Sequence, residues 1–313
     1  MATIILGLLF GFALLVWSAD RFVIGAVGLA HHFKISPIII GIVILGFGTS
    51  APELLISAIS AWKGNSGLAI GNAIGSNITN ISLILGVTAL LTPLLVARKT
   101  LRREFIVLFI STGIAWLVLQ DKLLSAFDGL ILLAGLLVAI TFLAVSSEDQ
   151  TEQDNKCECT LPIAFFWTLV GLTLLLISSH ILVSSSIKLA QFFGVSDLVI
   201  GLTIVAIGTS LPELAASITG AIKHHTDLAI GNVVGSNIFN TLGVIGIPGL
   251  IQTYRIPSEA LTRDFPIMIA LTILLFVLAL ITHKGKGMYR LSGITLLACF
   301  IAFQTTLYVQ NVA

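Results

Sequence analysis

Long apolar segments follow one another along the chain, separated only by short polar connections. About 20 apolar residues in a helix cross roughly 30 Å of hydrocarbon. Segments near or above this length predict ten transmembrane helices, at 3–28, 36–61, 67–92, 103–119, 125–146, 161–190, 196–222, 228–250, 265–282 and 289–308. With 313 residues in all, the chain has no room for an extramembrane domain between them.

Composition supports an all-α integral membrane protein. Hydrophobic residues make up 57% of the chain and charged residues only 10%, which is too apolar for a soluble domain. We expect the first segment to remain as a helix, because apolar sequence continues past Asp20 and Arg21 without a small-x-small cleavage pattern. These two residues are expected to pair locally. The net charge of +1 indicates no nucleic-acid partner.

The basic residues are distributed unevenly between the two sides of the predicted bundle. Cytoplasmic connections of membrane proteins carry an excess of Lys and Arg. If the N-terminus is outside, 11 of the 16 basic residues are cytoplasmic, and the other side keeps five: Lys63, Lys122, Lys188, Arg255 and Arg263. This predicts an inner or plasma membrane protein with both termini outside or periplasmic. The acidic segment 147–160 is then a cytoplasmic linker, and its Cys157 and Cys159 are too few for a zinc site.

The chain repeats itself at a constant offset. Residues 40–54 (IGIVILGFGTSAPEL) match 200–214 (IGLTIVAIGTSLPEL) at 9 of 15 positions, and both copies are 160 residues apart. Each half, 1–146 and 161–313, holds five predicted spans, so the second copy must enter the membrane inverted. Inverted repeats with interrupted helices at the bilayer midplane are typical of secondary transporters, although duplication also produces channels and scaffolds.

The first repeated motif places polar groups inside an apolar segment. In GTSAPE, Gly48 tolerates non-helical dihedrals and Pro52 lacks an N–H, which predicts a broken or kinked helix. The freed carbonyls lie near the hydroxyls of Thr49 and Ser50 and the carboxylate of Glu53. The copy supplies Thr209, Ser210 and Glu213. Such hard oxygen ligands suit Na⁺ and Ca²⁺, and two carboxylates balance one divalent cation.

The second repeated motif, GNAIGSNITN at 71–80, has a copy at 231–240. Its glycines allow a neighbouring helix to approach closely. Polar residues spaced four apart lie along one helical face and are expected to face a partner or an ion pathway: Asn72, Ser76 and Asn80, with Asn232, Ser236 and Asn240 in the copy. Asn77 and Asn237 lie off this stripe and are expected to cap or bridge helices.

The paired G-T-S-x-P-E and G-N-x-x-G-S-N motifs in two inverted halves resemble the alpha repeats of the calcium/cation antiporter superfamily, in particular its microbial sodium/calcium exchanger-like branch. The resemblance implies ten helices, with the second, third, seventh and eighth forming the ion-binding core and the long first and sixth sliding across it. It implies a calcium site at Glu53 and Glu213, assisted by backbone oxygens of Thr49 and Thr209. The implied sodium sites are Gly46, Thr49, Ser50 and Ser76, and in mirror image Ala206, Thr209, Ser210 and Ser236.

The resemblance also places Asn80 and Asn240 at the centre, where this branch often carries an aspartate in the second copy. With both residues neutral, only two titratable charges remain, so the sequence predicts an exchange ratio nearer two monovalent cations per Ca²⁺. Na⁺ is the first expectation and H⁺ the second. We expect no enzyme activity and no cofactor, and a passive cation channel is the remaining alternative. Oligomeric state and physiological direction stay open.

Overall fold

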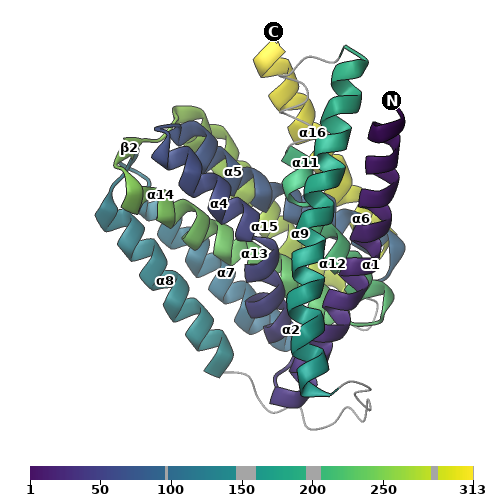
Figure 1. Ribbon diagram of the computed structural model, residues 1–313. Helices are drawn as coiled ribbons and strands as arrows, with labels where there is room; N and C mark the ends of the chain where they lie inside the picture. The colour runs from purple at the N-terminus through teal and green to yellow at the C-terminus, as the bar shows by residue number, and fades with distance from the viewer. Residues whose placement is uncertain (96–97, 146–159, 195–205, 283–287, 313) are drawn as a thin grey trace.

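The computed structural model describes residues 1–95, 98–145, 160–194, 206–282 and 288–312. Within them the chain is mainly helical. Strand pairing among these residues is limited to one two-residue antiparallel pair, β1 (Leu123–Leu124) and β2 (Tyr254–Arg255), and one isolated bridge between Leu94 and Met288. The N- and C-terminal ends lie at the same end of the bundle (Figure 1). Residues 146–159, with the predicted linker and its two cysteines, lie outside the described residues.

Two long helices, α1 (Ala2–Phe33) and α9 (Leu161–Phe192), run side by side along one flank of the bundle (Figure 1). Their backbones touch. A Cβ added to Gly171 would lie 2.6 Å from the backbone nitrogen of Phe22, and one added to Gly25 would meet the backbone of Thr168. These glycines therefore let the backbones of α1 and α9 approach each other closely.

Four interrupted helices form the centre. The first consists of α2 (Pro37–Ile40), η1 (Gly41–Gly46), α3 (Phe47–Thr49) and α4 (Ala51–Trp62). The second consists of α5 (Ser66–Thr79), η2 (Asn80–Ile84) and α6 (Leu85–Leu91). The described part of the third is α11 (Ala206–Thr209) and α12 (Leu211–Ile222), and the fourth is α13 (Thr226–Ile238), η4 (Phe239–Val244) and α14 (Ile245–Ile251).

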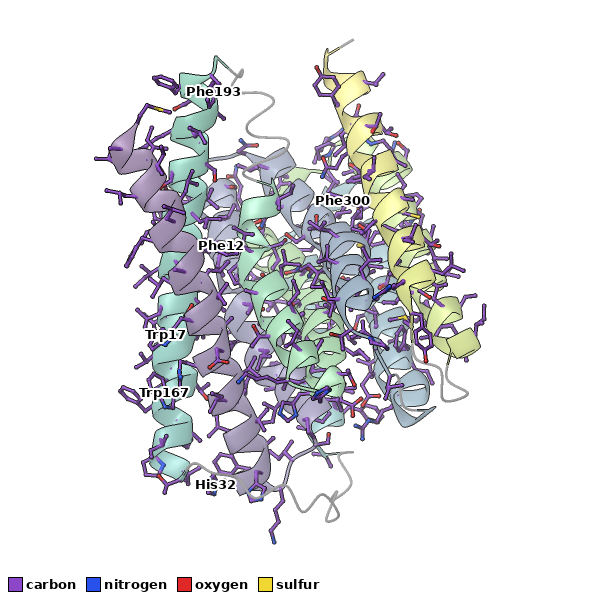
Figure 2. All side chains as sticks on the ribbon, turned by 90° about the vertical axis from the view of Figure 1, so that its right-hand side faces the viewer. Phe12, Trp17, His32, Trp167, Phe193 and Phe300 are labelled. Carbon is purple, nitrogen blue, oxygen red and sulfur yellow. The ribbon has the colours of Figure 1, made fainter. Side chains whose placement is uncertain are left out.

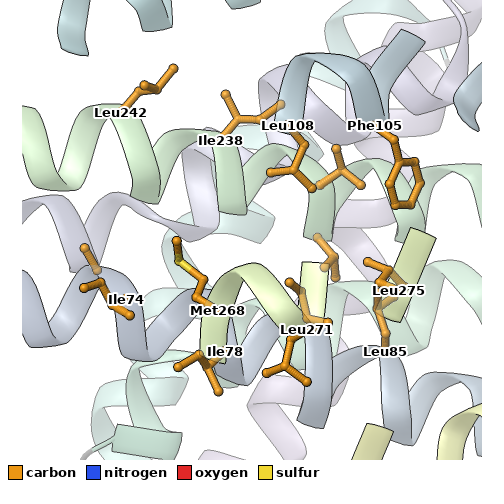
Figure 3. Close-up of a cluster of buried hydrophobic side chains, with 14 of the residues drawn as sticks. Ile74, Ile78, Leu85, Phe105, Leu108, Ile238, Leu242, Met268, Leu271 and Leu275 are labelled. Carbon is orange, nitrogen blue, oxygen red and sulfur yellow. The ribbon is translucent and has the colours of Figure 1, made fainter. Parts of the chain in front are cut away.

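The remaining helices cover this centre on the side away from α1 and α9. They are α7 (Arg98–Val118), α8 (Ala126–Val145), η5 (Ala260–Asp264), α15 (Phe265–Thr282) and α16 (Arg290–Val312). Buried apolar side chains fill the space between α5, α7, η4 and α15 (Figure 3). Phe105, Phe265 and Ile78 are each at most 1% exposed there. This packing fixes the second and fourth interrupted helices as a rigid support for the polar residues between them.

Among the described residues, seven helices are long and apolar enough to cross a membrane, and eight if the bent pair Pro37–Thr49 and Ala51–Trp62 counts as one span. Each of these eight overlaps a predicted segment. Of the other two predictions, 103–119 falls on the helix α7, which does not meet the same criterion, and 196–222 is described only from residue 206.

Candidate cation-binding site

The two GTSxPE motifs form matching helix breaks. Between α3 and α4 the helix bends by 42°. Ser50 has φ −81° and ψ 2° at this break, and Ser210 has φ −91° and ψ 7° between α11 and α12. A proline stands in the first turn after each break, where its missing N–H is not needed. The break predicted from Gly48 and Pro52 is therefore confirmed.

Each break places a glutamate at the N-terminal end of a new helix. Glu53 lies in the first turn of α4 and Glu213 in the first turn of α12. The unpaired N–H groups of a helix N-terminus favour negative charge there. Both side chains are fully buried, at 0% exposure. The chain thus encloses two acidic side chains near the middle of interrupted helices.

The predicted site residues gather around these breaks and on the helices opposite. Most of them are buried: Gly46, Thr49, Ser50, Ser76, Asn80, Ser210, Ser236 and Asn240. Thr209 ends α11 and is half-buried. Ala206 begins α11, and only its backbone position is described.

Hydrogen bonds connect the two halves of the chain directly at the site. The Ser50 hydroxyl donates to Oε1 of Glu213 at 3.4 Å. The Thr49 hydroxyl lies 3.3 Å from Oδ1 of Asn232 and 3.5 Å from Oγ of Ser236. Ser236 in turn donates to the carbonyl of Gly46 at 3.4 Å. Residues of the first break are therefore in contact with polar residues of the second half.

Two asparagines anchor the glutamate segments in the same way. Nδ2 of Asn72 donates to the carbonyl of Glu53 and to Oγ of Ser57, both at 3.1 Å. Asn232 donates to the carbonyl of Glu213 at 3.3 Å and to Oγ of Ser217 at 2.9 Å. The two serines recur at the same 160-residue offset but lie outside both repeated motifs, so the motifs alone did not indicate them. Each asparagine ties a glutamate-bearing helix to its neighbour.

Among the described residues, some of the central asparagines form hydrogen bonds between the two halves of the chain, and one of them, Asn240, does not. Asn77 donates to Oγ1 of Thr241 at 2.7 Å, and Asn80 donates to Oδ1 of Asn237 at 3.1 Å. The predicted bridging by Asn77 and Asn237 is therefore confirmed. Asn240 is 0% exposed, and in the described part of the chain neither its Oδ1 nor its Nδ2 has a hydrogen-bond partner.

Several other buried oxygens also have no partner within the described residues. They are both carboxylate oxygens of Glu53, Oε2 of Glu213, Oδ1 of Asn80 and Oγ of Ser210. A buried polar atom without a partner is costly, and a buried charge more so. A bound cation or a proton would compensate these groups. No cluster of three or more His, Cys, Asp or Glu able to hold a metal ion occurs among the described residues.

A serine on α9 contacts the second break. The Ser179 hydroxyl donates to the carbonyl of Gly208 at 3.0 Å, and both residues are buried. Helix breaks leave carbonyls without their usual partner, and Ser179 satisfies this one. Ser179 lies in an apolar segment outside either repeated motif, so no sequence pattern indicated this contact.

Comparison with known proteins identifies relatives along almost the full chain. The family described as "Sodium/calcium exchanger protein" matches residues 3–145 and 163–309. CaxA of Alkalimonas amylolytica is 44% identical over 309 residues, covering 96% of this chain and 97% of that protein. The inner membrane protein YrbG of Escherichia coli K12 is 37% identical and covers 96% of this chain and 95% of its own length.

A solved structure shares the fold. The sodium-calcium exchanger NCX_Mj, crystallised and soaked with zero Na⁺ and Ca²⁺, superposes with a TM-score of 0.85 at 30% identity. The match covers 98% of this chain and 99% of that one.

Proposed function

Because the chain belongs to the sodium/calcium exchanger protein family, we propose that it is a secondary antiporter that exchanges Ca²⁺ for Na⁺ by alternating access. The observation that carries this proposal is the pair of buried glutamates, three of whose four carboxylate oxygens have no hydrogen-bond partner among the described residues. Carboxylates in a membrane interior are expensive unless a cation or proton neutralises them. A transported cation meets this requirement at each step of a cycle.

In the proposed site, Ca²⁺ binds the carboxylates of Glu53 and Glu213 and the backbone oxygens of Thr49 and Thr209. Calcium prefers six to eight oxygen ligands of this kind. One sodium position uses Gly46, Thr49, Ser50 and Ser76. Its mirror image uses Ala206, Thr209, Ser210 and Ser236, and Asn80 and Asn240 lie between the two. The cross-contacts of Ser50 with Glu213 and of Ser236 with Gly46 support a site shared by both halves.

The proposed exchange ratio follows from charge. Glu53 and Glu213 are the titratable groups of the site, because Asn80 and Asn240 are neutral. One Ca²⁺, two Na⁺ or two protons each balance two carboxylates, whereas three Na⁺ would leave one excess positive charge in a low-dielectric site. We infer a ratio nearer two monovalent cations per Ca²⁺. The hydroxyl-rich surroundings favour Na⁺, and a proton-coupled exchanger of divalent cations is the second candidate.

The proposed architecture is two inverted five-helix repeats, 1–146 and 161–313, joined by a cytoplasmic linker at 147–160, with both termini outside or periplasmic. Asn72 and Asn232, which are 160 residues apart, each donate to a glutamate carbonyl and a serine hydroxyl at equivalent positions, and this supports the symmetry. Access to the site alternates as α1 and α9 move across the four central interrupted helices.

Transport in proteoliposomes tests the function. The purified protein is reconstituted, and Ca²⁺ uptake is measured under imposed Na⁺, K⁺ or pH gradients, one at a time. In an antiporter, Ca²⁺ uptake is driven by the outward flow of the coupling ion down its own gradient. Uptake driven equally well by a membrane potential with no counter-ion gradient would instead identify a channel.

A further inference from the structure

Helices α1 and α9 pack closely on each other and together form one body that contacts the core. Backbone contacts at Gly171 with Phe22 and at Gly25 with Thr168 leave no room for the two helices to shift independently. Trp17 of α1 and Trp167 of α9 also pack edge to face, with ring centroids 5.9 Å apart (Figure 2). Motion of this body relative to the core must therefore break or make contacts between it and the interrupted helices.

The first polar contact between this body and the core is an ion pair. Oδ1 of Asp20 on α1 lies 2.7 Å from Nζ of Lys223, the residue that ends α12. Its other oxygen lies 3.7 Å from Nε of Arg21, whose guanidinium stands over the rings of Trp17 and Trp167. The local pairing of Asp20 with Arg21 expected from the sequence is thus the longer contact, and the shorter one reaches the core.

The second polar contact lies at the helix break. Ser179 of α9 donates to the Gly208 carbonyl at the end of α11. Its neighbour Ser178 instead donates to Leu175 of its own helix at 2.8 Å. The ion pair and this hydrogen bond thus both end on the helix formed by α11 and α12.

The internal repeat supplies no equivalent contacts on the other side. At the 160-residue offset, Asp20 corresponds to His180 and Lys223 to Lys63, so the equivalent positions carry no acid–base pair. Ser179 corresponds to Ala19, which has no hydroxyl to donate. These two polar contacts therefore have no counterpart at the equivalent positions of the other repeat.

The packing of the α1–α9 body on the core also differs between the two ends of α1. In the half of α1 that ends at Phe33, the side chains of Phe22, Val23 and Ala26 are fully buried in an apolar cluster shared with the core. Toward the other end, a cavity of about 470 Å³ is lined by Leu8 of α1 and by Val183 and Phe193 at the C-terminal end of α9. Gly208 and Leu211 also line it, so it reaches the second helix break. Both motif glycines face α9, Gly48 at Leu172 and Gly208 at Val183, whereas exact symmetry would place one of them against α1.

We propose that the Asp20–Lys223 ion pair and the Ser179–Gly208 hydrogen bond form a one-sided latch that positions the α1–α9 body in this arrangement. The latch makes the two access states unequal in population, because one is stabilised by contacts that the other lacks. This inference rests on the proposed alternating access. It assigns Asp20, Lys223 and Ser179 as positioning residues that set the balance between states without touching the transported ion.

Distances between spin labels test the latch without any ion gradient. Cys157, Cys159 and Cys299 are replaced by serine, and labels are attached at Phe193→Cys near the end of α9 and at Trp62→Cys at the end of α4, both highly exposed positions. In the reference protein one distance should dominate. Asp20→Asn and Lys223→Met should each raise the population of molecules that show a second distance by about two- to fivefold. This is the size of effect expected for losing a half-exposed ion pair.

Matched variants separate the latch from general effects of substitution. Lys188→Met removes an exposed positive charge from α9 and should leave the distances unchanged, and Lys223→Arg should keep the reference distribution. Ser179→Ala should shift the distribution, whereas Ser178→Ala should not. Unchanged distances in Asp20→Asn, Lys223→Met and Ser179→Ala would overturn the latch whatever the transport assay gives. Shifted distances in a protein without Ca²⁺ exchange would support the latch and contradict the proposed function alone.

Discussion

The hydroxyl of Ser50 donates to Oε1 of Glu213 across 3.4 Å, joining residues 163 positions apart. Each belongs to a different copy of the same motif. The carboxylate of one repeat is therefore supported by the helix break of the other. A site built in this way responds to the relative placement of both halves, which is what an exchanger with two access states requires.

Removal of either carboxylate should abolish Ca²⁺ exchange. Glu53→Gln or Glu213→Gln leaves one negative charge for a divalent cation, and loss of one partner from a buried ionic site costs about 3 kcal/mol or more, over a hundredfold in affinity. Ca²⁺ uptake in proteoliposomes measures the effect. The control Glu259→Gln changes a fully exposed carboxylate and should transport normally. Normal Ca²⁺ affinity in either site variant would remove that residue from the site.

Asn240→Asp should change the coupling. The substitution adds a third titratable group among buried oxygens, so a third monovalent cation or a proton can be accommodated. We expect the exchange ratio to move from near two toward three, or the rate to become more dependent on pH. Reversal potentials in proteoliposomes give the ratio for both proteins. A ratio of three Na⁺ per Ca²⁺ in the unaltered protein would contradict the charge-balance argument.

Asn232→Ala should destabilise the protein more than Asn72→Ala. Both substitutions leave a glutamate carbonyl and a serine hydroxyl without their donor, which costs about 1–3 kcal/mol when the groups are fully buried. Asn232 is 0% exposed, whereas Asn72 is half-buried and water can replace part of its bonding. Thermal unfolding midpoints in detergent compare the two variants. An equal decrease of the unfolding midpoint in both variants would show that the different burial of Asn72 and Asn232 does not affect their contribution to stability.

Gly235→Ala should severely impair folding. A Cβ at this position would lie 2.5 Å from Cα of Ile42 and 2.6 Å from its carbonyl oxygen, so α13 could no longer pack on η1. Gly113→Ala is the matched control, because no atom lies within 4 Å of its added Cβ and alanine favours a helix by about 0.8–1.0 kcal/mol. Yield and melting temperature should fall for the first variant and stay level or rise for the second. A well-folded Gly235→Ala protein would refute the close packing.

The sequence by itself determined the helical membrane fold class and the location of the polar motifs. Apolar length alone predicts helices in lipid, since each backbone group must be satisfied internally. Gly48 and Pro52 predicted the break found at Ser50, because their effects on the backbone are local. The 160-residue repeat then identified the second break and Glu213 from the first.

Only the tertiary structure decided which polar groups meet. Thr49 contacts Asn232 and Ser236, which are more than 180 positions away in the sequence. The hydroxyls of Ser57 and Ser217 accept hydrogen bonds from Asn72 and Asn232. Asp20 was expected to pair with its neighbour, yet its shorter contact is with Lys223 on another helix. A repeat fixes which positions are equivalent, but it does not fix how a separate helix pair packs against them. Here the Asp20–Lys223 and Ser179–Gly208 contacts depend on residues that the repeat does not share.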